Sequence, residues 1–265
     1  METRNIAQYF DTNGYIGSLN VLDKDEVDDL KSNFKAFEDD IGKADAQYSL
    51  HNVHVVHPWV LRLASHPRVL GPIKQILGEN LILLDSRFIC KYPDTEVPGK
   101  DGTEAYVAWH QDVRYWGVTG DVVSVWLAVD DADEDNGCMF VIPGTHKSGI
   151  LEHHQASKGG NLLTSNQEIP EDLYNADEAV PCPLKAGQMS LHHGHLVHGS
   201  GPNRSERRRC GYVIRYVATS AYPIKDENRP RKFEATVLVS GEDNFNNFKD
   251  NAPQWFNRKN TDVIA

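Results

Sequence analysis

The chain has few cysteines, no long apolar run and a shortage of positive charge. Its four cysteines form no C-x-x-C pair, which predicts free thiols in a reducing compartment rather than a disulfide framework. No stretch approaches the roughly 18 apolar residues that a membrane helix requires. The polar residues 1–5 do not lead into the apolar core of a secretory signal. We therefore expect a cytoplasmic protein that does not enter a membrane.

The charge balance limits the partners. Lysine and arginine number 27 against 38 aspartates and glutamates, which gives a net charge of −11 at pH 7. Such a surface repels nucleic-acid phosphates and anionic lipid, so we expect neither as a partner. The 265 residues are 40% hydrophobic and 25% charged, enough for a full globular core and unlike collagen or a disordered chain. A small-molecule substrate is the expected partner, and the oligomeric state stays open.

The first eighty residues show helical periodicity. One apolar helix face is predicted by spacings of three and four among Val27, Leu30, Phe34 and Phe37. Pro58 and Pro67 stand where prolines begin helices, and Gly78 is suited to end the second of these. We expect residues 1–80 to form a helical support.

From residue 81 the pattern changes to short β-rich runs separated by turn residues. The predicted strands are 81–92, 105–110, 122–129, 138–142, 189–192, 210–217 and, more weakly, 235–239. No βαβ alternation occurs, so helices packed on an antiparallel barrel or sandwich are favoured over a parallel sheet. We expect a single domain over residues 1–265. Its core is 81–240, with a polar insertion at 151–183 over one barrel mouth and a loose tail at 241–265.

The segment Trp109-His110-Gln111-Asp112 suggests a metal site. Alternate residues of a strand share a face, so His110 and Asp112 can reach one ion together. The run His192-His193-Gly194-His195-Leu196-Val197-His198 offers the further histidine of a two-histidine, one-carboxylate triad, which suits non-haem Fe(II). Taken alone, the same residues also fit a solvated polar pair and surface histidines.

Three blocks follow one another along the chain: residues 109–116 (WHQDVRYW), 135–147 (DNGCMFVIPGTHK) and 198–205 (HGSGPNRS). In this order they resemble the phytanoyl-CoA hydroxylase (phytanoyl-CoA dioxygenase) family of Fe(II)- and 2-oxoglutarate-dependent oxygenases. The resemblance implies a mainly β protein with flanking helices: a double-stranded β-helix, jelly-roll and cupin-like, with iron at one open end. It implies His110, Asp112 and His198 as metal ligands and catalytic centre. His198 is chosen because it precedes the Gly-Ser step. His195 is the fallback, and His192 and His193 stay open.

A second cluster concerns the co-substrate 2-oxoglutarate. Its far carboxylate needs a buried cation, and arginine grips a carboxylate with two hydrogen bonds. In the run Arg207-Arg208-Arg209, the resemblance implies Arg209, two before Gly211, as that cation and leaves Arg207 and Arg208 at the surface. It also implies that three further residues, Ser200, Trp116 and Lys91, lie near the co-substrate. Trp116 could equally be a core tryptophan.

The resemblance further implies the reaction. Halogenating relatives carry a small residue where Asp112 stands, so halogenation is disfavoured and C–H hydroxylation is expected, consuming O2 and 2-oxoglutarate and releasing succinate and CO2. A barrel that binds a metal or ligand without catalysis is the competing hypothesis. A zinc hydrolase would need a zinc-bound water and no arginine clamp.

The substrate is indicated only by strand parity. Arg215 lies six residues after Arg209, so an unbroken strand points both into the barrel. A second buried arginine needs an anion. That anion can be a core aspartate or glutamate, or a group of the substrate. Other residues expected near this mouth are Arg87, Tyr106, Arg114 and Tyr115. A small polar or anionic metabolite (a phosphonate, a carboxylate or an ectoine-type solute) is preferred over an acyl-CoA or a secondary metabolite.

Overall fold

Two antiparallel sheets form the centre of the molecule. In the computed structural model, which describes residues 5–48, 50–99, 102–113, 117–225 and 233–258, the chain passes repeatedly from one sheet to the other between β2 and β11. The larger sheet has the order β1 (Tyr15–Asn20), β9 (Gln188–His193), β4 (Val123–Ala128), β11 (Arg209–Ala218), β2 (Leu81–Lys91), β12 (Val237–Ser240). The smaller has the order β3 (Val107–His110), β10 (His198–Ser200), β5 (Met139–Val141), β8 (Val180–Cys182). This is the strand order of a double-stranded β-helix, so the predicted fold class is confirmed.

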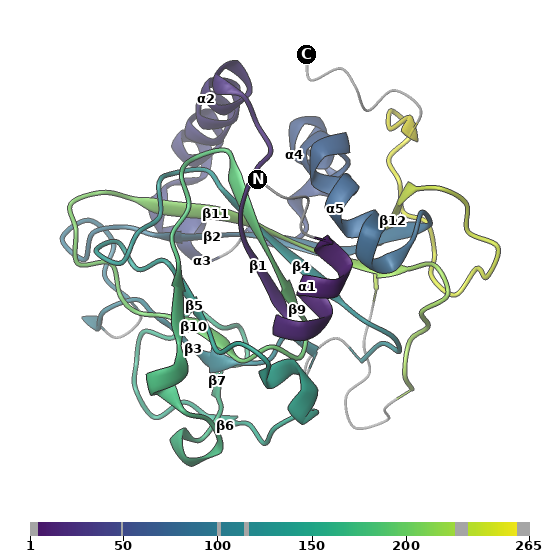
Figure 1. Ribbon diagram of the computed structural model, residues 1–265. Helices are drawn as coiled ribbons and strands as arrows, with labels where there is room; N and C mark the ends of the chain where they lie inside the picture. The colour runs from purple at the N-terminus through teal and green to yellow at the C-terminus, as the bar shows by residue number, and fades with distance from the viewer. Residues whose placement is uncertain (1–4, 49, 100–101, 114–116, 226–232, 259–265) are drawn as a thin grey trace.

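Helices cover the outer face of the larger sheet, on the side away from β3, β5 and β10 (Figure 1). They are α2 (Lys24–Ile41), α3 (Lys43–Tyr48), α4 (Pro58–Ala64) and α5 (Pro67–Leu77), with the 3-10 turn η1 (Val53–Val55) before α4. Pro58 and Pro67 begin α4 and α5, and Gly78 caps α5, as predicted.

The purely helical reading of residues 1–80 is wrong at one place. After α1 (Ile6–Asn13), Gly14 takes the left-handed conformation, which ends the helix. The next residues form β1, which adds to the edge of the larger sheet beside β9. This strand was missed because its partner lies about 170 residues later and its six residues alternate only weakly between buried and exposed.

Strand parity divides the larger sheet into two faces, as β11 shows. Cys210, Tyr212, Ile214 and Tyr216 face the helices and belong to the main apolar core. Arg209, Val213 and Arg215 face the other way and line the cavity between the sheets. The six-residue spacing of the two arginines thus places them on one side, as the sequence predicted.

Residues 163–165 of the segment 151–183 line the cavity between the sheets. The segment holds β6 (His154–Gln155), β7 (Gln167–Glu168), the 3-10 turns η4 (Glu171–Leu173) and η5 (Ala176–Glu178), and its last residues form β8 of the smaller sheet. A further turn, η3 (Thr145–Ser148), precedes it.

The prediction of a loose tail is wrong for residues 244–251. Phe248 is buried with Ile82 and Leu84, and the Asn251 amide donates to the Thr236 carbonyl. Residues 259–265 lie outside the described part of the chain.

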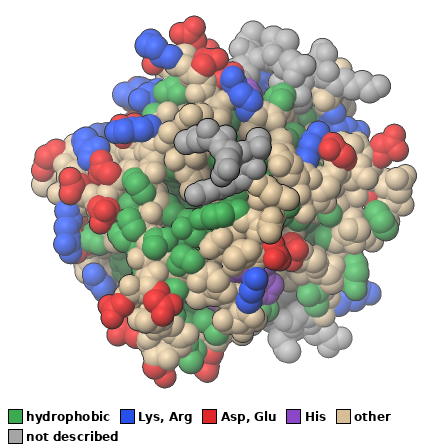
Figure 2. All heavy atoms as spheres, in the orientation of Figure 1, with side chains coloured by type: hydrophobic (Ala, Val, Ile, Leu, Met, Phe, Trp, Pro, Cys, Tyr) green, Lys and Arg blue, Asp and Glu red, His purple; other side chains and the backbone are tan. Residues whose placement is uncertain are grey.

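Two further observations concern the cysteines and the surface. All four cysteines are buried free thiols. Among the described residues, none of the helices combines the length and apolar character needed to cross a membrane. Acidic and basic side chains are interspersed over the face drawn in Figure 2, with apolar side chains between them.

Candidate metal centre and adjoining cavity

Three side chains predicted as ligands come together at the inner end of the cavity. His110 ends β3, Asp112 follows it, and His198 begins β10, which pairs with β3 so that His110 and His198 are direct partners. One ligand atom from each lies within 4.8 Å of the other two, and all three side chains are buried. Two imidazoles and one carboxylate in this arrangement can bind a divalent transition metal on one face of an octahedron.

Backbone hydrogen bonds fix how the two imidazoles are presented. His110 Nδ1 lies 2.8 Å from the Ala108 carbonyl, and His198 Nδ1 lies 2.9 Å from the Leu196 carbonyl. A carbonyl can only accept, so each Nδ1 carries the proton and each Nε2 keeps its lone pair for a metal. Burial, together with the nearby His110 and His192, lowers the pKa of His198 well below its ordinary value, which keeps that ring neutral. The donor set therefore fits a metal ion.

Asp112 is held by an arginine rather than left open. Arg215 donates from Nε and Nη2 to the two carboxylate oxygens, both at 3.1 Å, and Ser124 donates its hydroxyl to Oδ2 at 2.7 Å. Burial opposes ionisation of Asp112, but Arg215 and the neighbouring imidazoles hold its pKa well below the ordinary value. The carboxylate is thus ready as an anionic ligand.

Arg215 also contacts a second carboxylate. Its Nη1 donates to Asp85 Oδ1 at 3.2 Å, and burial raises the pKa of Asp85 to about 6 despite the attraction of Arg215. The sequence left open whether the counter-charge of Arg215 is a core carboxylate or a group of the substrate. The structure contains the first of these, an internal salt bridge from Arg215 to both Asp85 and Asp112.

His192 is a fourth buried imidazole at the centre. Its Nε2 lies 3.5 Å from Asp112 Oδ2, and its ring packs at a tilt of 49° against that of His198, with 4.4 Å between centroids. Neither of its ring nitrogens makes a hydrogen bond within the described part of the chain. By contrast, the fallback ligand His195 lies away from the three ligands, near His193.

Arg209 lies at the other end of the same strand face. Its guanidinium stacks on Trp126, 4.9 Å from the ring centroid, and Nε donates to the Gly137 carbonyl at 2.9 Å. Nη1 is buried without a hydrogen bond, and no carboxylate of the described residues lies within ion-pair distance. Burial lowers the pKa of Arg209 to about 10. A buried guanidinium that lacks a counter-charge is a ready site for a ligand carboxylate.

Lys91 and Ser200 adjoin Arg209. Lys91 of β2 lies opposite Arg209 of β11 in the strand register. Its Nζ donates hydrogen bonds to Ser200 Oγ at 2.6 Å and to the Gly201 carbonyl. Burial and the Arg209 charge lower the pKa of Lys91 well below its ordinary value. Ser200 lines the cavity, whereas Lys91 lies directly behind it.

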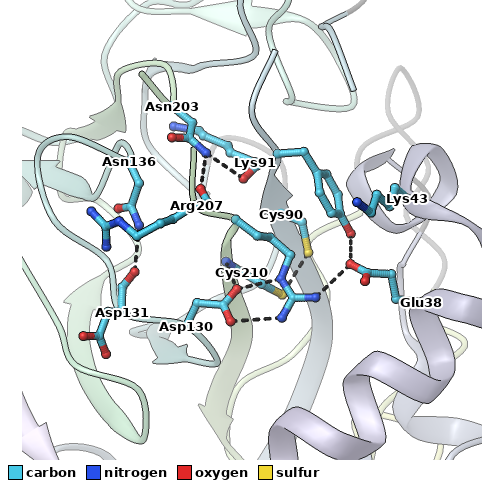
Figure 3. Close-up of polar contacts among 12 residues, drawn as sticks. Glu38, Lys43, Cys90, Lys91, Asp130, Asp131, Asn136, Asn203, Arg207 and Cys210 are labelled. Carbon is cyan, nitrogen blue, oxygen red and sulfur yellow. Dashed lines mark hydrogen bonds and ion pairs between the residues drawn. The ribbon is translucent and has the colours of Figure 1, made fainter. Parts of the chain in front are cut away.

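The other two arginines of the run have different surroundings. Arg207 is exposed and pairs with Asp133, as expected of a surface residue. Arg208, expected at the surface, is partly buried, and its guanidinium pairs with Asp130 at 2.7 Å and with Glu38 at 2.8 Å. Figure 3 shows these two carboxylates approaching one guanidinium from two sides, with Glu38 coming from α2. That partner is 170 residues away, so the run alone could not indicate it.

The cavity that joins these ends has a volume of about 230 Å³. Its mouth is lined by His51, Thr164 and Ser165, and Arg87 lines its wall from β2. Burial, with the charges of Arg87 and Arg215, lowers the pKa of His51 to about 4, so this imidazole is neutral at pH 7.

Tyr106 does not line the cavity, contrary to prediction. In the pairing of β10 with β3, His198 lies opposite His110 and Ser200 opposite Val107, so β3 has one extra residue. This bulge reverses the parity: Val107 faces the cavity, and the Tyr106 hydroxyl donates to the Lys158 carbonyl on the other side. The predicted residues Arg114, Tyr115 and Trp116 lie outside the described part of the chain.

Several residues of the site were missed by the sequence analysis. Trp126 and Ser124 could have been found by extending strand parity to β4, and Asp85 by extending it to β2. His192, which the sequence analysis left open, could have been placed by the same argument on β9. His51 carries no such signal, because it reaches the mouth through an isolated bridge to Arg87.

Relatives were found by sequence. One is described as a probable alpha-ketoglutarate-dependent hypophosphite dioxygenase from Stutzerimonas stutzeri, 28% identical over 72% of this chain and 64% of its own length. Another is a phytanoyl-CoA dioxygenase domain-containing protein 1 from Danio rerio, 31% identical over 67% of this chain and 59% of its own length. The matched region thus spans less than two thirds of these relatives.

Solved structures with the same fold were also found. A non-heme monooxygenase, ThoJ in its apo form, superposes with a TM-score of 0.75 at 26% identity, covering 94% of this chain and 88% of that one. CytC3 with Fe(II) and alpha-ketoglutarate superposes with a TM-score of 0.64 at 21% identity, covering 93% and 91%, and shares the fold. The model of the phytanoyl-CoA dioxygenase family matches residues 10–211, and the chain belongs to that family.

Proposed function

We propose that this protein is an Fe(II)- and 2-oxoglutarate-dependent dioxygenase that hydroxylates a C–H bond of a small, anionic metabolite. The observation that carries the proposal is one cavity with two different ends. Three side chains that could hold a metal converge at one end, and a buried arginine with no carboxylate partner among the described residues lies at the other. A keto acid that chelates a metal through one end and presents a carboxylate at the other matches this pair of features.

In this proposal His110, Asp112 and His198 hold the iron. Bound there, Fe(II) would couple oxidative decarboxylation of 2-oxoglutarate to insertion of one oxygen atom into the substrate. The protein's own part is to hold the ligands and exclude water. Arg215 and Ser124 fix the Asp112 carboxylate, and the backbone carbonyls at Ala108 and Leu196 fix the two imidazoles. Because Asp112 supplies a carboxylate ligand, hydroxylation is favoured over halogenation.

The co-substrate would lie between the metal and Arg209. The unused Nη1 of Arg209 is available for the far carboxylate, and the Ser200 hydroxyl, oriented by Lys91, offers a further hydrogen bond. The indole of Trp126 excludes water from the guanidinium. The relative named as alpha-ketoglutarate-dependent supports the same co-substrate.

The size of the cavity favours a small substrate. Its volume of about 230 Å³ is below the roughly 300–1,000 Å³ of pockets that enclose drug-sized ligands. A co-substrate and a long acyl chain would not both fit inside it. An acyl-CoA or a bulky secondary metabolite is therefore the less favoured alternative.

The test is anaerobic loading with Fe(II) and 2-oxoglutarate, followed by exposure to O2 and measurement of succinate. We expect iron at one equivalent per chain and slow succinate release that a panel of small carboxylates and phosphonates, with hypophosphite included, accelerates. The competing hypothesis is a barrel that binds metal or ligand without catalysis. It predicts iron binding with no succinate, which would refute the proposed reaction.

A further inference from the structure

We propose that Arg87 binds an anionic group of the substrate, a carboxylate or a tetrahedral phosphorus oxyanion, at the mouth side of the metal centre. This subsite rests on the proposed function and identifies the residue that selects the substrate. Arg215, the residue first suggested by strand parity, is already engaged with two carboxylates.

Arg87 is a buried cation with no ionic partner in the part of the chain that the structure describes. It is 5% exposed, and no carboxylate of the described residues lies within 4.0 Å of its guanidinium. Its hydrogen bonds go to two backbone carbonyls, from Nη1 to Leu162 at 3.1 Å and from Nη2 to Tyr48 at 3.3 Å. Its buried Nε makes no hydrogen bond to any residue that the structure describes. Carbonyl oxygens satisfy part of the donor capacity of a guanidinium but do not neutralise its charge.

The charge balance of the cavity points to the same residue. Among the described residues, three arginines line it (Arg87, Arg209 and Arg215), against the two carboxylates Asp85 and Asp112. The two carboxylates pair with Arg215, and a divalent metal together with a dianionic co-substrate adds no net charge. When the co-substrate carboxylate is bound to Arg209, the positive charge of Arg87 has no counter-charge among these groups. An anionic substrate would provide that negative charge.

The position of Arg87 suits a substrate next to the metal. On β2 it lies two residues from Asp85 and four from Lys91, with all three side chains on one face. Two residues along a strand span about 6.7 Å, so Arg87 is close to the metal end and well separated from the co-substrate end. His51, neutral and able to donate, and the Thr164 hydroxyl stand at the mouth beside it, 3.4 Å apart.

A purely structural role is the alternative. The hydrogen bonds of Arg87 to Leu162 and Tyr48 connect the insertion loop to the last residue of α3, so the residue could simply hold the loop. The two roles differ in what they predict for charged and uncharged ligands. A structural residue affects both equally, whereas a charge partner affects the anion alone.

The experiment measures binding without turnover. Wild type, Arg87→Met and Arg87→Lys are loaded anaerobically with Fe(II) and saturating 2-oxoglutarate, which also blocks Arg209. They are then titrated calorimetrically with short alkyl carboxylates and alkylphosphonates and with the matching neutral amides and phosphonate diesters. Arg62→Met, an arginine of α4 outside the cavity, is the matched control.

We expect the wild type and Arg62→Met to bind at least one anion more than tenfold tighter than its neutral counterpart. Arg87→Met should lose that preference, Arg87→Lys should retain part of it, and iron content and 2-oxoglutarate affinity should not change. The proposal is overturned if the wild type shows no preference for anions, or if Arg87→Met weakens acid and neutral ligand alike. Succinate release by the wild type in air is read separately. Absence of succinate would refute the dioxygenase reaction, whereas the calorimetric titrations would still decide whether Arg87 binds an anion.

Discussion

At the scale of single residues, the role of a buried or partly buried arginine depends on its counter-charge. Arg215 forms ion pairs with Asp112 and Asp85, and Arg208 forms ion pairs with Asp130 and Glu38. Arg209 has no ion pair with a carboxylate of the described residues. A buried ion without a partner is costly, so such a residue is kept for a ligand. Burial alone does not distinguish these cases.

Replacing Arg209 by Ala should raise the 2-oxoglutarate concentration needed for half-maximal succinate release more than tenfold. Removing one partner of a buried arginine–carboxylate pair costs about 2–5 kcal/mol. Iron binding should be nearly unchanged, because the ligands are at the other end of the cavity. Arg207→Ala is the control, since that side chain is exposed and paired with Asp133. Equal defects in the two variants would contradict the assignment.

The distal ligand can be tested by a pair of histidine variants. His198→Ala should abolish stoichiometric iron binding, because it removes one of the three converging ligand atoms, whereas His195→Ala should retain it. Iron content after desalting is the measurement, and a circular-dichroism spectrum checks that both variants are folded. Retained iron in His198→Ala together with its loss in His195→Ala would show that the wrong histidine was assigned.

At the scale of elements, regular strands were predictable and irregular ones were not. The parity of β11 placed Arg209 and Arg215 on one face, and the local spacing of His110 and Asp112 brought two ligands together. The bulge of β3 could not be foreseen, because it depends on pairing with β10, and it turned Tyr106 away from the cavity. The Glu38 partner of Arg208 depends in the same way on a contact between distant segments. Sequence patterns carry periodicity within one element, but not the register between elements.

The pairing of β11 with β4 explains why a glycine stands two residues after Arg209. A Cβ at Gly211 would lie 2.1 Å from Cζ2 of Trp126, whose ring supports Arg209. Gly211→Ala should therefore displace the indole, destabilise the protein by about 1–3 kcal/mol and weaken 2-oxoglutarate binding. Urea unfolding and co-substrate titration are the measurements. Adding Trp126→Phe, which makes room, should recover stability. If the double variant is no more stable than Gly211→Ala, this steric explanation is wrong.

At the scale of the whole molecule, polar clamps connect the helical layer to the sheets. Arg208 joins Asp130, which follows β4, to Glu38 of α2, and Glu38 also accepts from the Tyr92 hydroxyl (Figure 3). Arg208→Ala leaves both carboxylates without their cation, and we expect a loss of about 3 kcal/mol in the free energy of unfolding. Arg207→Ala, which breaks an exposed pair, should cost less than about 1 kcal/mol. Comparable losses in urea titrations of the two variants would exclude a special role for this clamp.

A second connection between layers makes stability depend on pH. His54 of η1 is fully buried, with Nδ1 2.6 Å from Ser86 Oγ on β2 and Nε2 2.8 Å from the Ala235 carbonyl before β12. Burial lowers the pKa of His54 from 6.5 to about 4. Between these values the unfolded chain takes up a proton that the folded protein does not, so stability falls as the pH decreases from 6.5 to 4.

The contribution of His54 to this acid sensitivity should be about 2 kcal/mol between pH 7 and pH 4.5. His54→Gln cannot titrate, so it should lose less stability than the wild type over that interval, whatever its stability at pH 7. Ser86→Ala is the matched control: it removes the hydrogen bond to Nδ1 but keeps the buried imidazole, and should retain the pH dependence. Urea unfolding of the three proteins at both pH values measures the difference. If His54→Gln and the wild type have the same pH dependence, the acid sensitivity of the fold comes from other groups, because a neutral buried imidazole must contribute the proton uptake of its unfolded state.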